Sequence, residues 1–324
     1  MSSQYSTSPA ALPLPRVPGP KLGPFTPDAH AEIKFMEALG SSDDLDSEVW
    51  KVEINGTVYA LKMFDFCSPG YLKNAIAREL AQPLSSPQAY EDYHDPFNCE
   101  CRAYGRLAQE NRLDLAVPAH GYLLLTPQQE GQVTAMITGD LEHEPDDEEP
   151  LGTLNGEKTW GRWEEQRGQP IRAIVKELVE DDDFEEAFKT GRISASTMWR
   201  DLEDLHALGI LVRDIHMGNY IGGRLVDLSR AWTMYHPGLD RIRRRDLARL
   251  RRLDTHGLLV MLQDWWMETL VVDELEIPES LERCEAGEND HGTDPRGYNW
   301  LRWEEDGEAA TAYVELELFT REPE

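Results

Sequence analysis

The stretch that decides the fold is LHALGILVRDIHMGNYIGGRLVDLSRA, residues 205–231. Three of its polar residues, Asp214, Asn219 and Asp227, are separated first by five and then by eight positions. Carboxylate and amide oxygens are ligands that a hard cation such as Mg²⁺ prefers, and an aspartate can accept a proton from an attacking hydroxyl. The stretch therefore contains the residue types from which a cation site and a proton acceptor are built.

The glycine pair Gly222-Gly223 predicts how these residues come together. A two-residue turn at this pair places Asn219 opposite Val226, so that Asp227 lies beside Asn219 at the open end of a hairpin. Oxygens of both side chains then reach one divalent cation, whose other ligands are waters and substrate phosphates.

A second hairpin is predicted upstream, because Asn55-Gly56 separates the β-rich runs VWKVEI and TVYALKMF. Its register sets Lys62 opposite Val49. A loop-like stretch over residues 85–97 precedes a helix in CECRAYGRLAQE, which is followed by an apolar strand in HGYLLLT.

The chain then leads back to the first stretch. After the strand IRAIV, a helix is predicted from about residue 195 to residue 208, and Gly209 is suited to its C-terminal cap. The helix therefore ends immediately before the polar residues of the first stretch.

These motifs resemble, in chain order, those of the protein-kinase superfamily. VRDIHMGN and DLS are similar to the catalytic loop and the metal-binding motif, YALK to the third strand, ECRAYGRL to the helix that supplies a glutamate, and IVKELVED to the strand and hinge that hold adenine. The resemblance covers roughly residues 30–235. It implies a two-lobed α+β fold with a small β-rich N-lobe and a reduced, mainly helical C-lobe.

The resemblance also implies how ATP would be held. Lys62 would contact the α and β phosphates and pair with Glu100, a glutamate on the helix that follows. Ala60 and the backbone of Glu177 and Val179 would hold the adenine.

The remaining matches concern the chemical step. Asp214 would be the catalytic base, and Asn219 and Asp227 would be the Mg²⁺ ligands. His216 gives the stretch the D-x-H-x-x-N form of aminoglycoside and choline kinases, and a positive or proton-donating group there would help to neutralise transferred phosphate. Glu79 is an alternative to Glu100 as the partner of Lys62.

Several positions depart from the kinase pattern. The glycine-rich phosphate loop is reduced to Gly40 followed by SSDDLDSEV, Val212 replaces a histidine, Ser229 replaces a glycine, and no A-P-E segment follows Arg230. Two functions therefore stay open. One is an ATP- and Mg²⁺-dependent phosphotransferase acting on a protein or small-molecule hydroxyl. The other is a pseudokinase-type adaptor or scaffold that binds nucleotide without turnover.

A narrower resemblance rests on the combination of PFNCECRAYGRL, HGYL, a long insertion and a short C-lobe. This combination is similar to a fungal group of kinase-like proteins named after a kinetochore complex subunit. The name implies a binding role in the founding member, and a protein partner is therefore one expectation for this chain.

Composition excludes other classes of function. The chain of 324 residues has 61 acidic and 32 basic residues and a net charge of −29, which would repel a nucleic-acid backbone. No run is apolar and long enough for a signal peptide or a membrane span. The four cysteines, Cys67, Cys99, Cys101 and Cys284, are expected to be reduced thiols. We therefore expect a cytoplasmic or nuclear protein without nucleic-acid or membrane partners.

The domain boundaries follow from composition. Residues 1–24 are rich in proline and serine and are predicted to be a disordered tail. Residues 25–175 form the predicted N-lobe, with an exposed acidic insertion at about 127–169 in which tryptophans serve as packing anchors. Residues 176–324 form the C-lobe with a divergent C-terminal extension. Its arginine-rich stretch, 241–252, is either a solvated helix or a docking site for phosphate or an acidic partner.

Overall fold

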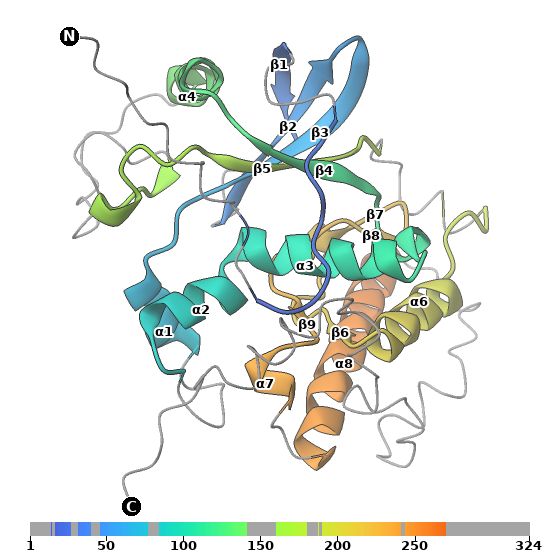
Figure 1. Cartoon of the computed structure of the whole chain (residues 1–324). Coiled ribbons are helices and arrows are strands. Elements are labelled where there is room, and N and C mark those ends of the chain that lie inside the picture. The colour runs from blue at the N-terminus through green and yellow to red at the C-terminus, as the bar shows by residue number, and fades with distance from the viewer. Residues whose placement is uncertain are drawn as a thin grey trace, which may run out of the picture.

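The structure is a computed structural model, and it describes residues 14, 17–26, 32–39, 46–76, 84–140, 160–179, 187, 190–240 and 244–269. Within these residues an antiparallel sheet lies above a group of helices (Figure 1). The α+β fold class expected from the sequence is therefore confirmed, with the strands mainly in the first half and helices predominating in the second.

The sheet has five strands in the order β1-β2-β3-β5-β4. Their bounds are β1 Ile33–Ala38, β2 Ser47–Ile54, β3 Thr57–Phe64, β4 Ala119–Leu124 and β5 Arg172–Glu177. The predicted hairpin joins β2 to β3, with positive φ angles at Asn55 and Gly56, and Lys62 pairs with Val49 as expected. Because β3 pairs with β5, Lys62 and Ile174 face the same side of the sheet.

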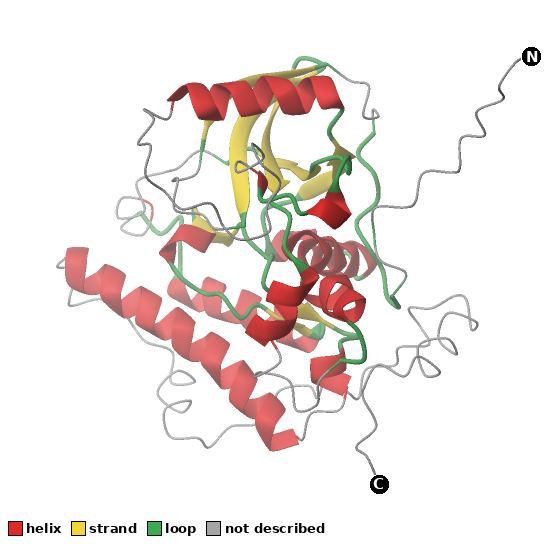
Figure 2. Ribbon diagram, turned by 90° about the vertical axis from the view of Figure 1, so that its left-hand side faces the viewer, coloured by secondary structure: helices red, strands yellow, loops and turns green. Residues whose placement is uncertain are grey.

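Helix α3, Pro96–Gln109, covers that side of the sheet (Figures 1 and 2). Asp95 caps its first turn by accepting a hydrogen bond from the amide of Asn98 at 3.2 Å. The same carboxylate accepts two bonds from the guanidinium of Arg172 on β5, at 2.9 and 3.0 Å. A buried bidentate ion pair therefore ties the start of the helix to the sheet. The predicted loop over residues 85–97 is wrong, because residues 87–94 are helical and α3 begins at Pro96.

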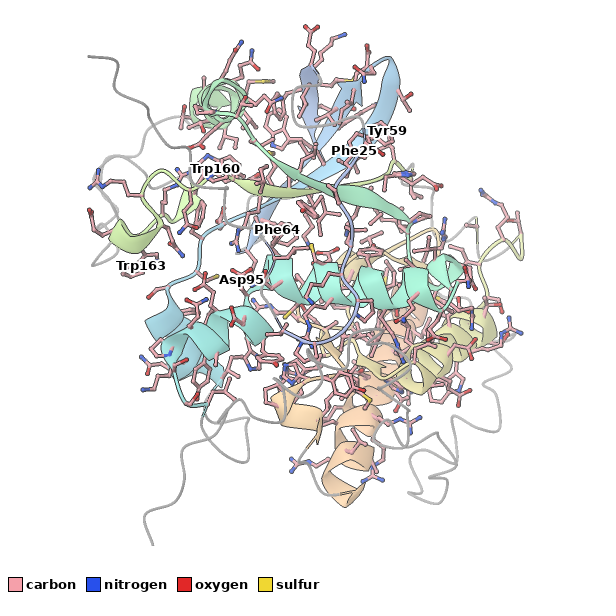
Figure 3. All side chains as sticks on the ribbon, viewed as in Figure 1. Phe25, Tyr59, Phe64, Asp95, Trp160 and Trp163 are labelled. Carbon is pink, nitrogen blue, oxygen red and sulfur yellow. The ribbon has the colours of Figure 1, made fainter. Side chains whose placement is uncertain are left out.

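Helix α4, Pro127–Asp140, covers the opposite face of the sheet. Its Val133 packs with Leu61 of β3 and with Trp160, which is 2% exposed and donates a hydrogen bond to the Thr134 hydroxyl at 2.8 Å (Figure 3). The expectation of an exposed acidic loop is therefore wrong for the described parts of the insertion, whereas the packing role of Trp160 is confirmed. Residues 141–159 lie outside the described residues, as do Trp300 and Trp303.

The segment 17–26 crosses α3 in an extended form. The amide of Leu22 donates to the carbonyl of Cys101 at 2.8 Å, and the amide of Phe25 donates to Tyr122 at 2.9 Å. A Cβ at Gly105 would lie 2.4 Å from the Cα of Lys21, so only glycine permits this approach. The predicted disordered tail is therefore wrong for residues 17–24, because the proline-rich composition concealed apolar residues that the helix surface buries.

The second half of the described chain is mainly helical. Its elements are α6 Ala195–Ala207, β6 Ile210–Leu211, η4 Met217–Asn219, β7 Tyr220–Ile221, β8 Arg224–Leu225, β9 Trp232–Thr233, α7 Pro237–Asp240 and α8 Arg244–Thr269. Helix α6 ends as predicted, with Gly209 at a φ of +76°. None of the helices within the described residues is long and apolar enough to cross a membrane.

Two short helices precede α3, namely α1 Pro69–Ile76 and α2 Pro87–His94. They pack through Leu72 and Tyr90 onto Trp232 of β9 and Leu239 of α7. Two turns of 3-10 helix complete the described elements, η1 Leu113–Leu115 and η3 Glu164–Gln166. The α1–α2 pair therefore joins the sheet-bearing half of the molecule to the helical half.

Candidate nucleotide-binding cleft

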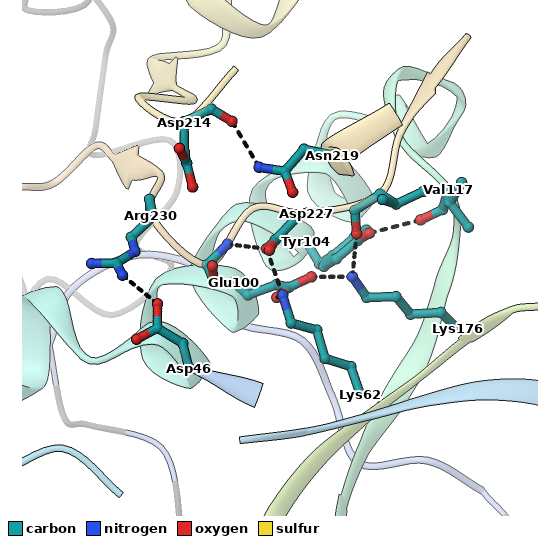
Figure 4. A network of polar contacts seen from close by, with 12 residues as sticks. Asp46, Lys62, Glu100, Tyr104, Val117, Lys176, Asp214, Asn219, Asp227 and Arg230 are labelled. Carbon is teal, nitrogen blue, oxygen red and sulfur yellow. Dashed lines mark hydrogen bonds and ion pairs between the residues drawn. The ribbon is translucent and has the colours of Figure 1, made fainter. Parts of the chain in front are cut away.

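Lys62 is the centre of a buried ionic network in the cleft (Figure 4). Its Nζ atom lies 3.0 Å from Oε2 of Glu100 and 2.6 Å from Oδ1 of Asp227. The strand alternation turns Lys62 toward α3, and the capped start of α3 positions Glu100 beneath it. Glu100 is therefore the partner of Lys62, while the alternative, Glu79, lies outside the described residues.

A second lysine, Lys176, joins this network. Its ammonium contacts Oε1 of Glu100 and donates to the carbonyl of Val226 at 2.5 Å. The sequence analysis did not single out Lys176. A signal was available, because Lys176 lies two residues after Ile174 in an apolar strand and therefore faces the same side of the sheet as Lys62. Two ammonium groups thus share one buried glutamate.

Asp227 completes the network in its ionised form. Burial alone raises the pKa of this carboxyl, but the charges of Lys62 and Lys176 and the hydrogen bonds from Lys62 and the Ser229 amide outweigh that effect. The pKa of Asp227 is therefore held well below its ordinary value. The Ser229 amide donates at 2.7 Å, so the serine found in place of glycine still supplies this bond.

The predicted glycine hairpin is present. Gly222 and Gly223 have φ angles of +58° and +76°, and the Val226 amide donates to the carbonyl of Asn219 at 2.9 Å. The side-chain amide nitrogen of Asn219 donates to the backbone carbonyl of Asp214 at 2.8 Å. This bond fixes the Asn219 amide and joins the catalytic-loop aspartate to the hairpin.

The donor set fits a hard cation. Asn219 and Asp227 both line the cleft and offer oxygen atoms, which are the ligands that Mg²⁺ prefers. Within the described part of the chain, no group of three or more His, Cys, Asp or Glu side chains could hold a metal ion. Two protein ligands with the rest supplied by phosphate and water is the arrangement common for Mg²⁺ in nucleotide sites.

The rest of the cleft is apolar. It is lined by Ala60, Glu177 and Val179, the three residues expected to hold adenine, and by further aliphatic side chains, Leu39, Val49, Val117, Leu178, Ile221 and Val226. Aliphatic walls beside a few polar groups are typical of small-molecule sites. The predicted cleft residues, apart from Glu100 beneath the cleft, therefore converge on one cavity.

Asp46 and Arg230 form an ion pair between the two halves of the molecule (Figure 4). Asp46 immediately precedes β2, and Arg230 follows the metal-binding motif. Residues 40–45, the predicted phosphate loop, lie outside the described residues. Asp46 is the first residue after these that the structure describes, and its carboxylate pairs with Arg230.

Comparison with known proteins places the chain in a family. A family model described as kinetochore Sim4 complex subunit FTA2 matches residues 10–232. This chain belongs to the FTA2 family. The predicted relationship to kinase-like proteins named after a kinetochore subunit is thereby confirmed. No curated protein matches significantly.

Solved structures similar to this FTA2-family chain include kinase domains. The BubR1 kinase domain is 14% identical, with a TM-score of 0.37 over 78% of this chain and 68% of that chain. Vaccinia related kinase 3 is 10% identical, with a TM-score of 0.34 over 96% of this chain and 88% of that chain. These likenesses concern the fold alone, and no argument about the site rests on them.

In this FTA2-family chain, Asp254 of α8 holds the loop that leads into Asp214. Its carboxylate accepts hydrogen bonds from the amides of Val212 and Arg213, both at 2.8 Å, and lies 3.0 Å from Nε2 of His206. Arg213 has a φ of +68°, a conformation that is strained for a residue with a side chain and needs such support. The sequence reading missed Asp254, because about forty residues separate it from the loop that it holds.

Replacing Asp254 with alanine is expected to lower the free energy of unfolding by roughly 3 kcal/mol, because two buried amides and His206 lose their acceptor. Asp254→Asn should fall between wild type and alanine, since it keeps one acceptor oxygen. Urea unfolding measures both changes, with Glu203→Ala on the exposed side of α6 as the control. A loss for Asp254→Ala no larger than that of the control would contradict this role of Asp254.

His216 lies beside Asp214 on the exposed side of the loop. Its Nε2 is 3.8 Å from Oδ2 of Asp214, and the two side chains are 54% and 47% exposed. His216 is not among the residues that line the cleft. Its predicted role on transferred phosphate stays a prediction, and it lies beside Asp214, the predicted proton acceptor.

Proposed function

We propose that this chain is an ATP- and Mg²⁺-dependent phosphotransferase that transfers the terminal phosphoryl group to a hydroxyl. One observation carries the proposal, namely that Lys62 pairs with both Glu100 and Asp227 next to Asn219, which is itself bonded to the backbone of Asp214. A structural ion pair alone would not place an amide and a carboxylate, Asn219 and Asp227, in the lining of an apolar cleft.

Each residue has a separate task in this proposal. Lys62 moves from Asp227 to the α and β phosphates, while its ion pair with Glu100 keeps the lysine side chain extended into the cleft. Asn219 and Asp227 would hold Mg²⁺, which when bound neutralises phosphate charge. Asp214 accepts the proton of the acceptor hydroxyl as its oxygen attacks the phosphorus. Positioning by a preformed cleft then supplies much of the rate.

A second candidate is favoured by the family description itself. A kinetochore complex subunit acts among protein partners in the nucleus. An adaptor of this kind would bind nucleotide only to stabilise its fold, without turnover. The replacement of glycine by Ser229 and the small phosphate loop support this alternative. Both candidates require nucleotide binding, and they differ in turnover.

Nucleotide binding is tested by thermal unfolding with ATP and Mg²⁺. At about 100 times Kd, a ligand that binds only the folded state adds about 2.7 kcal/mol, which corresponds to a rise in Tm of roughly 5–10 °C. Asp227→Asn should remove most of the Mg²⁺-dependent part of this rise, because it weakens the cation site. Asp214→Asn is the matched control and should keep the rise.

The outcome that contradicts nucleotide binding is also defined. An equal rise in Tm for wild type and Asp227→Asn, or no rise for wild type at any ATP concentration, would show that the cleft does not hold Mg²⁺-ATP. The same samples treated with EDTA separate the effect of the metal from that of ATP alone.

A further inference from the structure

Asp214 lines a second pocket, formed between helix α1 and the catalytic loop. Tyr71 and Leu72 of α1 form one wall, and Arg213, Asp214 and Arg230 form another. The pocket shares no lining residue with the nucleotide cleft. The proton acceptor of the proposed reaction therefore faces a cavity of its own.

Positive charge predominates among the groups that line this pocket. The Arg213 guanidinium lies 3.9 Å from the centre of the Trp232 ring, which holds it in place, and Arg230 is half-exposed beside its partner Asp46. Two guanidinium groups thus accompany one lining carboxylate, that of Asp214. Arginine forks favour phosphate and carboxylate groups, because they donate two parallel hydrogen bonds.

His94 adds an uncharged polar group to the same pocket. Burial, followed by the charges of Arg213 and Arg102, lowers the pKa of His94 to about 3, so its imidazole is neutral at physiological pH. The residue is 6% exposed, and its buried Nε2 has no hydrogen-bond partner within the described residues. Contacts with Tyr90, Trp232 and His236 hold the ring in place. A buried imidazole nitrogen without a partner is unusual, and His94 is one of the residues that line this pocket.

We propose that this pocket holds the phosphoryl acceptor, a small soluble molecule that carries both a hydroxyl and an anionic phosphate or carboxylate group. The anionic group binds Arg213 and Arg230, and the hydroxyl lies against Asp214. This inference rests on the proposed function. In the step, the hydroxyl proton passes to Asp214, a bond forms between the hydroxyl oxygen and the γ-phosphorus of ATP, and the bond to the β–γ bridging oxygen breaks, releasing ADP.

The architecture favours a small acceptor over an extended peptide. Helices α1 and α2 pack against β6, β9 and α7, and Tyr71 and Leu72 of α1 and His94 of α2 line the pocket. Two arginines and the single carboxylate of Asp214 share the lining of this one pocket, which suits a small ligand with one anionic group. A phosphorylated peptide is therefore treated as an outcome of the test.

The test is calorimetric titration of the full chain with glycerol 3-phosphate, in the absence of nucleotide and Mg²⁺, and with glycerol as the uncharged counterpart. Glycerol 3-phosphate should bind and glycerol should not. Arg230→Gln should weaken binding by roughly tenfold, the usual effect of losing one charge-assisted contact. Arg200→Gln, an exposed arginine on α6, is the charge-matched control and should bind as wild type.

Lys62→Met identifies which cavity holds the anion. Binding that survives Lys62→Met but weakens in Arg230→Gln supports the pocket. The reverse pattern would place the anion in the nucleotide cleft and overturn the proposal, as would the absence of binding or a preference for a phosphoserine peptide over glycerol 3-phosphate. Because no ATP is present, this experiment can succeed even if phosphoryl transfer is never detected, so the two proposals fail separately.

His94→Phe tests the unpartnered nitrogen without removing the ring. The phenyl group keeps the aromatic contacts, so the variant should unfold at a temperature close to that of wild type. Its affinity for glycerol 3-phosphate should nevertheless fall severalfold, since one hydrogen bond is lost. Unchanged affinity would show that His94 serves only packing and would remove it from the site.

Discussion

Replacing Asp214 with asparagine is expected to slow phosphoryl transfer by a factor of about 10² to 10⁴ while leaving the affinity for ATP nearly unchanged. The reason is the position of this side chain. It is 47% exposed, takes no part in the ion pairs of Lys62, and faces the acceptor pocket instead of the nucleotide cleft. Its backbone carbonyl, which orients Asn219, is present in either variant.

The measurement is phosphate release and transfer from labelled ATP, at saturating ATP and Mg²⁺ and with purified variants matched for concentration. Glu203→Gln, a remote and exposed carboxylate on α6, is the control for loss of one negative charge. If Asp214→Asn retains the wild-type rate, the activity does not arise from this site. If wild type itself turns over no faster than buffer while still binding Mg²⁺-ATP, the adaptor function replaces the phosphotransferase.

Replacing Glu100 with glutamine is expected to lower the free energy of unfolding by about 3 to 5 kcal/mol, because it leaves buried ammonium groups without their shared counter-charge. Glu100 is fully buried, and Lys62 and Lys176 have side chains that are 5% and 6% exposed. In the variant only Asp227 remains to balance both lysines. Glutamine has nearly the same shape, so the loss reflects charge more than packing.

A double variant separates the charge effect from a local packing defect. Adding Lys176→Met to Glu100→Gln removes one of the two ammonium groups and restores the balance between Lys62 and Asp227, so stability should recover in part. Denaturant unfolding of wild type, both single variants and the double variant gives the coupling free energy. Simple additivity of the two single changes would mean that Lys176 and Glu100 do not act as one network.

The sequence predicted well those parts of the site that depend on short turns and on strand register. The Asn-Gly and Gly-Gly turns fix the register of their hairpins within a few residues, and this register brings Lys62 to the inner face of the sheet and Asp227 beside Asn219. The helix cap at Gly209 was likewise readable, because positive φ at a helix end strongly favours glycine.

The sequence predicted much less about segments that are buried by contact with elements far away in the chain. Residues 17–24 were predicted to belong to a disordered tail because residues 1–24 are rich in proline and serine, yet Gly105 leaves room for this segment to pack on α3. Helix α4 lies in a stretch that was expected to be an acidic loop, and its partner across the fold is Trp160. Neither contact has a signal within a short window of sequence.

The polar residues that hold the site follow the same division. Turn chemistry, strand alternation and motif order in the sequence alone determined the catalytic-loop hairpin and the positions of Lys62, Asn219 and Asp227. Only the tertiary structure decided that Lys176 shares Glu100 and that Asp254 supports Arg213, since these pairs are 76 and 41 residues apart. The conformation of a turn is set by steric contacts within a few neighbouring residues. The pairing of a buried charge depends instead on which opposite charges the fold brings to it from distant parts of the chain.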